Sequence, residues 1–319
     1  MSGRKYEVVA VGLQCIDIVS SPVPADILQR DMTLVDSVQL HLGGDALNQA
    51  IVLSRLGART AIMGVVGHDA LGDVLQDRLE RNGVEVLNRR SDINTAISIV
   101  LPDQSGERHF VYQPGNNRLL SWEHIRTDAL KNTAFLSIGG SMSLPGLDGE
   151  GMIRLLKTAR QYGAQTAMDF KVSSARFDRT LMKEALTLTD YVLPSEREAC
   201  VLTGEKKDPR QMAEGLREMG ARNCIIKLGG AGCYVLADGF EGIIPSYPCR
   251  CIDTTGAGDT FVGAFLFAKS RGWDIARCAR FANAAGSIAV EHPGANGAIQ
   301  CLEQVLKRMD HQPERRKSV

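Results

Sequence analysis

The chain alternates between short apolar runs and longer amphipathic segments, and this alternation limits its possible folds more than any other feature. The short runs are apolar and β-branched, as in buried strands, while the longer ones space their apolar residues for a helix and several end in glycine. The predicted strands are 6–12, 59–67, 166–170, 191–194 and 223–229, and the predicted helices include 45–57, 69–83, 150–162 and 208–219. This order predicts a mostly parallel sheet covered on both faces.

Composition excludes several classes of protein. The 319 residues are 44% hydrophobic and 23% charged, enough for one large α/β domain with an appendage or for two domains. No apolar run approaches the ~20 residues of a membrane-spanning helix. Lys plus Arg and Asp plus Glu both total 37, without the positive excess of a nucleic-acid binder, so a small substrate is expected. The short, Glu-interrupted apolar start reads as a strand rather than an export signal, which predicts a cytoplasmic protein.

Two segments interrupt the alternation, and both lie in the first 120 residues. Residues 13–42 contain the proline-rich SSPVPAD and the alternating SVQLHLGG, and residues 94–115 read as two strands joined by a glycine-containing turn. We expect them to form a small β-rich lid on one domain spanning 1–310. Two irregular surface hairpins are the alternative. The charged tail 311–319 lacks apolar periodicity and is predicted to be disordered.

The stretch 251–265, CIDTTGAGDTFVGAF, places a bare glycine turn directly before an apolar run. Phe261, Ala264, Phe265 and Ala268 recur at helical spacing, so a buried helix is predicted to begin near Ala257. Its first turn exposes unpaired N–H groups, and a helix N-terminus with glycines beside it attracts anions. A carboxylate beside an anion can take a proton from a hydroxyl that attacks phosphorus. The stretch therefore predicts phosphoryl transfer to an alcohol, the alternative being a plain turn that caps a core helix.

Three other junctions support the phosphoryl-transfer interpretation. The chain has no Gly-Lys dipeptide, so a Walker-type P-loop is absent and a nucleotide must be held differently. A second glycine pair leads into a helix at 43–50, GGDALNQA. Two glutamates lie at a strand-to-helix junction at 193–199, and 226–235, IKLGGAGCYV, reads as a glycine-rich hairpin.

In this order and spacing, these segments resemble the ribokinase-like (PfkB-type) carbohydrate kinase family. The resemblance runs from VAVGLQCID through GGDALNQA and GERHFVYQPGNN to DTTGAGDTFVGAF and HPGAN, and its most specific part is 253–259, DTTGAGD. It implies a doubly wound α/β fold with a β-sheet lid over the sugar, together with ATP and Mg²⁺. In some members it also implies a monovalent cation such as K⁺.

The resemblance also implies roles for single residues. The catalytic residues are the general base Asp259 and an anion hole of Gly256, Ala257 and Gly258. The sugar ligands are Asp17, Gly43, Gly44 and Asn48. The ATP-binding residues are Lys227, Gly229, Gly232, Asn283 and Ser195. Glu198 organises magnesium and phosphate through water. Carbonyls of Asp253, Thr255, Ala289, His292 and Gly294 fall where some members hold the monovalent cation.

The departures from the family pattern concern the substrate. Ser195 stands where the family has asparagine in an Asn-x-x-Glu motif, which weakens the expected phosphate and magnesium network. Cys15 stands where ribokinases proper have an asparagine. The segment 136–143, LSIGGSMS, has no glutamate where ribokinases use one to bind the sugar, so both departures argue against ribose as the substrate. Lys171 and Arg176 are either solvated charges or ligands of a sugar acid or phosphate.

We therefore expect an ATP-dependent, magnesium-requiring kinase of a small sugar. Two alternatives remain, a nucleoside kinase whose YQPGNN segment closes over a base, and a sugar-binding regulator that has lost catalysis. Intact Asp259 argues against the regulator. Exposed apolar residues on the lid predict a homodimer that pairs two lids. The candidates are Val38, Leu40, Ile97, Ile99 and Val111.

Overall fold

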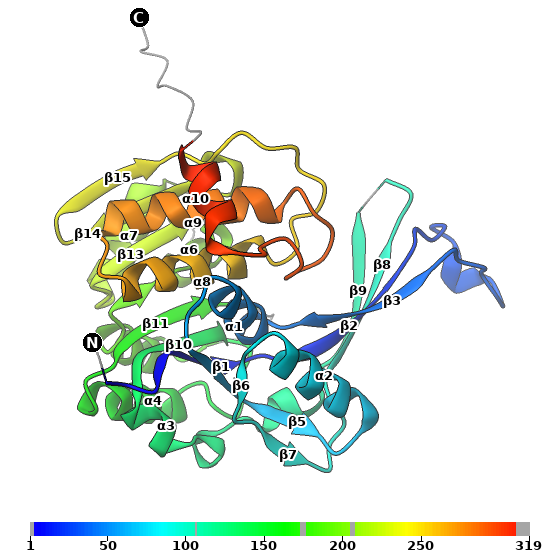
Figure 1. The fold of residues 1–319 in the computed structure, drawn as a ribbon, viewed down its shortest axis with the longest axis horizontal. Coiled ribbons are helices and arrows are strands. Elements are labelled where there is room, and N and C mark those ends of the chain that lie inside the picture. The colour runs from blue at the N-terminus through cyan, green and yellow to red at the C-terminus, as the bar shows by residue number, and fades with distance from the viewer. Residues whose placement is uncertain (1–2, 106, 173–176, 205–207, 311–319) are drawn as a thin grey trace, which may run out of the picture.

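The computed structural model describes residues 3–105, 107–172, 177–204 and 208–310. A nine-stranded sheet in the order β15-β14-β13-β12-β11-β10-β1-β4-β6 forms its centre, and a smaller sheet projects to one side (Figure 1). The tail 311–319, predicted to be disordered, lies outside the described residues. The central strands are β1 (Tyr6–Gly12), β4 (Thr60–Met63), β6 (Glu85–Val86), β10 (Thr133–Ser141), β11 (Gln165–Phe170), β12 (Tyr191–Val192), β13 (Asn223–Lys227), β14 (Cys233–Ala237) and β15 (Phe240–Ile244).

The central sheet is doubly wound, as predicted. From β6 to β13 every neighbouring pair is parallel, and only the pairs β13–β14 and β14–β15 are antiparallel, so that β14 alone is reversed. Side chains alternate along a strand, so Val9 and Val11 of β1 face one layer of helices while Val8 and Ala10 face the other. The first layer contains α3 (Thr127–Lys131), α4 (Glu150–Gln161), α5 (Arg179–Thr187), α6 (Glu196–Thr203) and α7 (Pro209–Glu218). The second contains α1 (Asp45–Arg55), α2 (Ala70–Arg81), α8 (Ala257–Ser270), α9 (Ile275–Ala289) and α10 (Leu302–Asp310).

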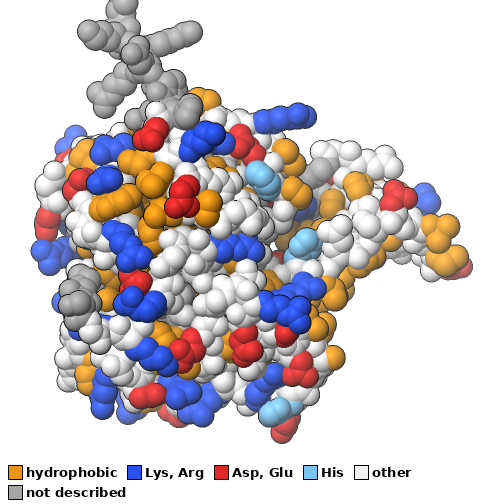
Figure 2. Space-filling model, in the orientation of Figure 1, with side chains coloured by type: hydrophobic (Ala, Val, Ile, Leu, Met, Phe, Trp, Pro, Cys, Tyr) orange, Lys and Arg blue, Asp and Glu red, His pale blue; other side chains and the backbone are white. Residues whose placement is uncertain are grey.

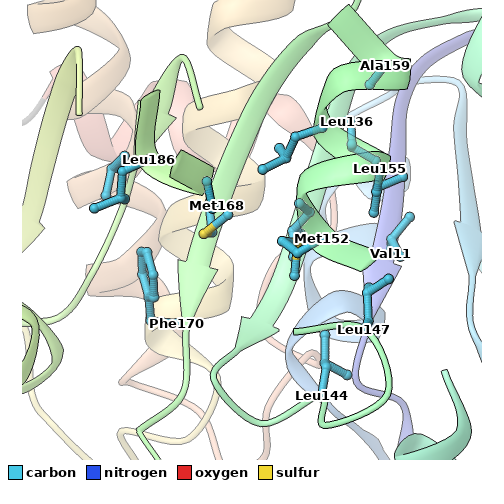
Figure 3. Packing of buried hydrophobic residues seen from close by; sticks show 14 of the residues in the cluster. Val11, Leu136, Leu144, Leu147, Met152, Leu155, Ala159, Met168, Phe170 and Leu186 are labelled. Carbon is cyan, nitrogen blue, oxygen red and sulfur yellow. The ribbon is translucent and has the colours of Figure 1, made fainter. Parts of the chain in front are cut away.

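Helix α4 shows how the first layer packs on the sheet. Met152, Leu155 and Ala159 of α4 lie over Val11 of β1 and Leu136 of β10, and all five side chains are buried (Figure 3). Burial of apolar side chains on this scale contributes most of the free energy that holds a helix to a sheet. β10 ends at Ser141 and β11 at Phe170, and the candidate site begins at these ends.

The small sheet contains the strands expected in the two interrupting segments. β2 (Cys15–Ser20) pairs with β3 (Val38–Gly43) and with β8 (Ile97–Pro102), and β8 pairs with β9 (Arg108–Gln113). Residues 21–37 are mainly irregular, with one short 3₁₀ turn, η1 (Ile27–Gln29). The alternative of two separate surface hairpins is wrong, because β2 and β8 join both segments into one sheet.

One predicted strand was wrong. The run 59–67 forms two strands, β4 and β5 (Val65–Gly67), that belong to different sheets, and β5 pairs with β7 (Arg89–Ser91). The chain leaves the central sheet at Gly64, where a Cβ atom would collide with the side-chain amide of Gln14. An unbroken apolar run gives no sign of such a change of sheet. Among the described residues, no helix combines the length and apolarity needed to cross a membrane.

Candidate active site

The predicted helix start after the glycine turn is present. Gly256 precedes α8 with φ of +71°, in the left-handed region that favours glycine, and a Cβ there would collide with the backbone of Ala295. Residues 259–268 are all buried, so the helix is held on all sides while its N-terminus opens beside Gly258. A Cβ on Gly258 would meet only the end of the Lys227 side chain, 3.6 Å from Nζ. The first turn therefore has room for an anion.

Asp259 is held by a chain of two amides. Asn48 of α1 donates from Nδ2 to Asp259 Oδ2 at 2.7 Å, and Asn296 donates from Nδ2 to Asn48 Oδ1 at 2.9 Å. Asn296 also donates to the carbonyl of Leu42, 2.9 Å away. Within the described part of the chain, no hydrogen bond reaches Asp259 Oδ1. This carboxylate is thus oriented through one oxygen and keeps the other for a ligand.

Burial raises the pKa of Asp259 well above that of an ordinary carboxyl, and the nearby Asp45 and Asp169 raise it further. The hydrogen bond from Asn48 and the charge of Lys171 act in the opposite direction. A carboxylate with a raised pKa is a better proton acceptor, which suits a general base. The buried position and the raised pKa of Asp259 therefore fit the role of general base expected for it.

Lys227 lies on the other side of the turn in a buried ion pair. Its Nζ lies 2.5 Å from Oδ1 of Asp169, and Gln49 donates to the second Asp169 oxygen at 3.1 Å. Burial lowers the pKa of Lys227, but Asp169 and Glu198 outweigh it and the net shift is upward. The lysine therefore remains a cation beside Gly258. Asp169 is the last residue but one of the buried strand β11, and a charged residue within such an apolar run is the signal that could have identified it.

Asp17 is placed on the opposite wall, on β2. Its carboxylate lies where a Cβ on Gly43 would be, so Gly43 is required by close packing. Burial raises the pKa of Asp17, while Cys15, 3.4 Å away through Sγ, and the charge of Lys171 lower it. In the register of the small sheet, Asp17 shares a face with Tyr112 of β9. This face turns toward the centre of the molecule.

Asp45, which sequence reasoning did not single out, joins this wall from the first residue of α1. Its Oδ1 pairs with Lys171 Nζ at 3.3 Å, and its Oδ2 is buried with no hydrogen-bond partner in the described structure. The pKa of Lys171 is raised, chiefly by Asp45. Buried acceptors are normally satisfied, so Oδ2 is suited to a hydroxyl or an ordered water.

The expected ATP residues divide into two groups. Gly229 lies in the short turn between β13 and β14 with nothing near its missing side chain, whereas a Cβ on Gly232 would collide with the backbone at 244–246. Asn283 donates from Nδ2 to the carbonyls of Ile244 at 2.9 Å and Pro245 at 3.2 Å. Gly229 is thus open to a ligand. Gly232 and Asn283 instead hold the backbone at the end of β15 in place.

Ser195 and Glu198 form a capping box at the start of α6. The backbone N–H of Ser195 donates to Glu198 Oε2 at 2.7 Å, and the backbone N–H of Glu198 donates to Ser195 Oγ at 3.3 Å. Serine in place of the family's asparagine therefore has a structural use. The other carboxylate oxygen of Glu198 has no hydrogen bond in the described structure, and its charge acts on Lys227.

The two loops expected to hold a monovalent cation meet at Asp253. Its Oδ1 accepts hydrogen bonds from Thr255 N and Oγ1 at 2.8 and 2.6 Å, and its Oδ2 accepts one from Gly294 N at 2.9 Å. The carbonyl of Ala289 accepts a bond from His292 N at 3.2 Å. Arg108 of β9 pairs with Asp253 Oδ1 at 2.6 Å, which links the small sheet to the loop before α8. No cluster of three or more His, Cys, Asp or Glu side chains that could hold a metal ion exists among the described residues.

The structure thus joins Asn48 to Asp259 and sets Lys227, paired with Asp169, beside Gly258, at the carboxyl ends of β11 and β13. Gly232 and Asn283 instead pack against or bind neighbouring backbone. Ligands of open α/β sheets bind at the carboxyl ends of the strands. Comparison with known proteins agrees with this geometry. Residues 5–301 match the family model for pfkB family carbohydrate kinases, and the chain belongs to this family.

Curated relatives include both ribokinases and fructokinases. The chain is 27% identical to a ribokinase from Haemophilus influenzae over 86% of its own length and 89% of the relative. It is 28% identical to fructokinase-1 from Oryza sativa subsp. japonica over 97% and 99%. The structure of Arabidopsis thaliana ribokinase with ribose and ATP shares the fold with a TM-score of 0.81 and 24% identity, covering 95% of this chain and 98% of that one. The chain is thus a sugar kinase of the ribokinase and fructokinase type.

Proposed function

We propose that the protein transfers the γ-phosphoryl group of ATP to a hydroxyl group of a small sugar. Asp259 Oδ1 takes the proton of the acceptor hydroxyl, its oxygen attacks the phosphorus, and ADP leaves. The N–H groups of Gly256, Ala257 and Gly258 and the cation of Lys227 stabilise the charge on the transferring group. The observation that carries the proposal is Asp259, with one free oxygen, in the open first turn of α8.

The acceptor is assigned to the wall formed by Asp17 and Asp45, with Gly43 and Gly44 shaping it. Carboxylate oxygens accept hydrogen bonds from hydroxyl groups, and several of them on one wall suit a neutral polyol. Lys171 is already paired with Asp45, which disfavours a sugar acid as its ligand. Arg176, the other cation considered for such an acid, lies outside the described residues.

We assign ATP to the open turn at Gly229, beside Asn283, with Ser195 and Glu198 near its phosphates. Magnesium, when it accompanies ATP, neutralises phosphate charge, and it keeps several water ligands, so one free Glu198 oxygen fits a water-mediated contact. Asp253 joins the two loops through its hydrogen bond from Gly294, and we assign potassium to the carbonyls of 253, 255, 289, 292 and 294 on these loops. ATP as a substrate and the eight unpaired cysteines fit a cytoplasmic protein.

A coupled assay of ADP release tests the proposal. Purified protein with ATP and Mg²⁺ is screened against neutral sugars, sugar acids, sugar phosphates and nucleosides. We expect release that depends on a neutral sugar or its derivative and that is lost in Asp259→Asn. Stabilisation by a sugar without any ADP release would instead establish a non-catalytic binding protein.

The outer face of the small sheet supports the proposed homodimer. Leu40, Ile18, Ile99 and Val111 are neighbours in one row across the four strands, and Leu40, Ile99 and Val111 are 40%, 38% and 59% exposed. Val38 is 59% exposed, and Ile97 is partly buried. Figure 2 shows hydrophobic side chains along this projecting part. Two copies packed through this face would cover it, and light scattering at micromolar protein should give a dimer mass that Val111→Lys reduces to a monomer.

A further inference from the structure

A second compartment adjoins the acceptor wall. It is a cavity of about 550 Å³ between the small sheet, the end of β10 and helices α4 and α5. Cavities of roughly 300–1,000 Å³ hold drug-sized molecules, so this one exceeds the need of a single monosaccharide ring. Its residues play no part in the proposed transfer of the phosphoryl group.

Three structural features place this cavity beside the acceptor site. Tyr112 lines the cavity and shares the inner face of the small sheet with Asp17. Ser141, another lining residue, accepts a backbone hydrogen bond from Lys171 at 2.9 Å, and the side chain of Lys171 pairs with Asp45. Gly140, one residue before, has its missing side chain 3.0 Å from Asp45 Oδ2. An acceptor that reaches Asp17 and Asp45 thus has the cavity beside it.

The side chains that line the cavity are mainly apolar, and several of them are flexible methionines. Three methionines, Met142, Met152 and Met182, face the space together with Phe177 and Tyr112. Methionine is flexible and polarisable, and its sulfur packs favourably against aromatic rings. Figure 3 places Met152 on α4 in the buried layer near the end of β10. Such a wall favours a planar, apolar group over a hydrated one.

The polar groups of the cavity are mostly occupied by the protein itself. Both oxygens of Asp148 accept backbone hydrogen bonds, from Met142 at 3.1 Å and Leu144 at 2.8 Å, and Asp178 caps α5. Met142 has φ of +72°, the one positive value among non-glycine residues of the described chain. Such a conformation costs free energy and persists where the surroundings impose it, commonly at ligand sites. Arg118 is exposed.

We propose that this cavity holds an uncharged, planar ring of the acceptor, whose faces pack on the apolar lining, so that the substrate is a substituted sugar, of the class of glycosides and nucleosides. This inference rests on the proposed kinase function. The sugar ring lies against Asp17 and Asp45 with one hydroxyl at Asp259, and the substituent extends past Tyr112 toward Phe177. Burial of the substituent then contributes to binding.

The test compares each free sugar with its substituted form. D-ribose, D-fructose and D-glucose are assayed for ADP release beside their phenyl glycosides, with uridine, adenosine and fructose 6-phosphate in the same panel. We expect at least one phenyl glycoside or nucleoside to exceed its free sugar in kcat/KM by about 100-fold, as expected for burial of an aromatic ring. A preference for free sugars, or for the sugar phosphate, would overturn the inference and leave the kinase proposal intact. Absence of ADP release with every acceptor would overturn both.

A variant that narrows the cavity provides an independent measurement. Ala185 of α5 lines the cavity and is 4% exposed, so Ala185→Leu adds volume there. The ratio of kcat/KM for the substituted acceptor to that for its free sugar should fall about 10-fold, and the thermal stabilisation by the substituted acceptor should shrink. Ala70→Leu, at the exposed first residue of α2, is the matched control and should leave the ratio unchanged. An unchanged ratio in a folded Ala185→Leu protein would contradict the proposal.

Discussion

The beginnings of α1 and α8 look alike in sequence, yet only α8 leaves open space beside one of its glycines. Each helix follows a glycine-containing turn and carries an aspartate in its first turn. At α1 the space is filled: a Cβ on Gly44 would lie 2.5 Å from the carbonyl oxygen of Leu13, and Gly43 packs on Asp17. At α8 the turn glycine Gly256 is likewise packed, against the backbone of Ala295, but the space beside Gly258 is open, and the nearest atom outside the helix is the end of a lysine side chain. A glycine-rich helix start therefore indicates close packing or a ligand, and only the neighbouring residues distinguish the two.

The two helix starts also divide the proposed reaction between them. The α1 side brings Asp17 and Asp45 and is assigned to the acceptor, while the α8 side brings Asp259 and the N–H groups assigned to the phosphoryl group. The hydrogen bond from Asn48 to Asp259 joins the two sides. Substitutions on the α1 side should therefore weaken the use of the acceptor more than that of ATP. Substitutions on the α8 side should mainly lower the rate of phosphoryl transfer.

The largest effect is expected at Asp259. Asp259→Asn keeps the size and the bond to Asn48 but removes the proton acceptor, so turnover should fall about 10²-fold to 10⁴-fold. ATP affinity, measured by calorimetry on the same sample, should change little. Near-normal turnover in this folded variant would remove Asp259 from the role of base.

The pH dependence of the wild type probes the same carboxylate. Burial first, and then the nearby Asp45 and Asp169, raise the pKa of Asp259 well above the usual range. The base acts only when ionised, so kcat/KM for the acceptor should rise with pH through this pKa, with a midpoint clearly above the ordinary aspartate value of about 3.9. A midpoint at or below that value would contradict the account of the site.

On the α1 side, Asp17→Ala should separate the two substrates. Loss of hydrogen bonds from sugar hydroxyls to a carboxylate should weaken acceptor use by about 1.5–3 kcal/mol. The apparent affinity for ATP should stay close to that of the wild type. Equal losses for both substrates, measured by initial rates, would show that Asp17 is not an acceptor ligand.

The glycines themselves can be compared directly. Gly44→Ala places a Cβ at φ of +99° against Leu13, so the free energy of unfolding should fall by about 1–3 kcal/mol. Gly258→Ala meets no backbone and should leave stability near that of the wild type, but turnover should fall about 10-fold because the added Cβ narrows the anion site. Denaturant unfolding and initial rates on both variants check this. A reversed pattern would contradict the assignment of the two turns.

The smallest effect is expected from potassium, which acts on the α8 side alone. A cation between the loops at 253–255 and 289–294 would fix the N–H groups of the first turn before ATP arrives, and donors fixed in advance stabilise transition-state charge better. Rates in tetramethylammonium buffer should rise a few-fold when potassium chloride replaces part of the salt at constant ionic strength. Equal rates with and without potassium would show that these loops have only a structural role.

Sequence reasoning predicted the parts of this molecule that local patterns encode. The mostly parallel sheet covered on both faces, the strands of the small sheet and the start of α8 near Ala257 follow from periodicity and glycine placement. Contacts between distant segments could not be predicted in this way. Lys227 and Asp169 are 58 residues apart, and Asn48 and Asp259 are 211 apart. The first pair depends on the order of strands in the sheet and the second on the packing of α1 against α8, and a single sequence reveals neither.

The most direct test of the central claim follows the phosphorus atom. Wild-type protein, ATP, Mg²⁺ and the best acceptor of the screen are observed together by ³¹P NMR. A base aimed at an acceptor hydroxyl, in a site that holds the phosphoryl group at the start of α8, predicts one new phosphomonoester of the acceptor for each ADP formed. Inorganic phosphate in place of that ester, or ATP left unconsumed with every acceptor, would contradict it.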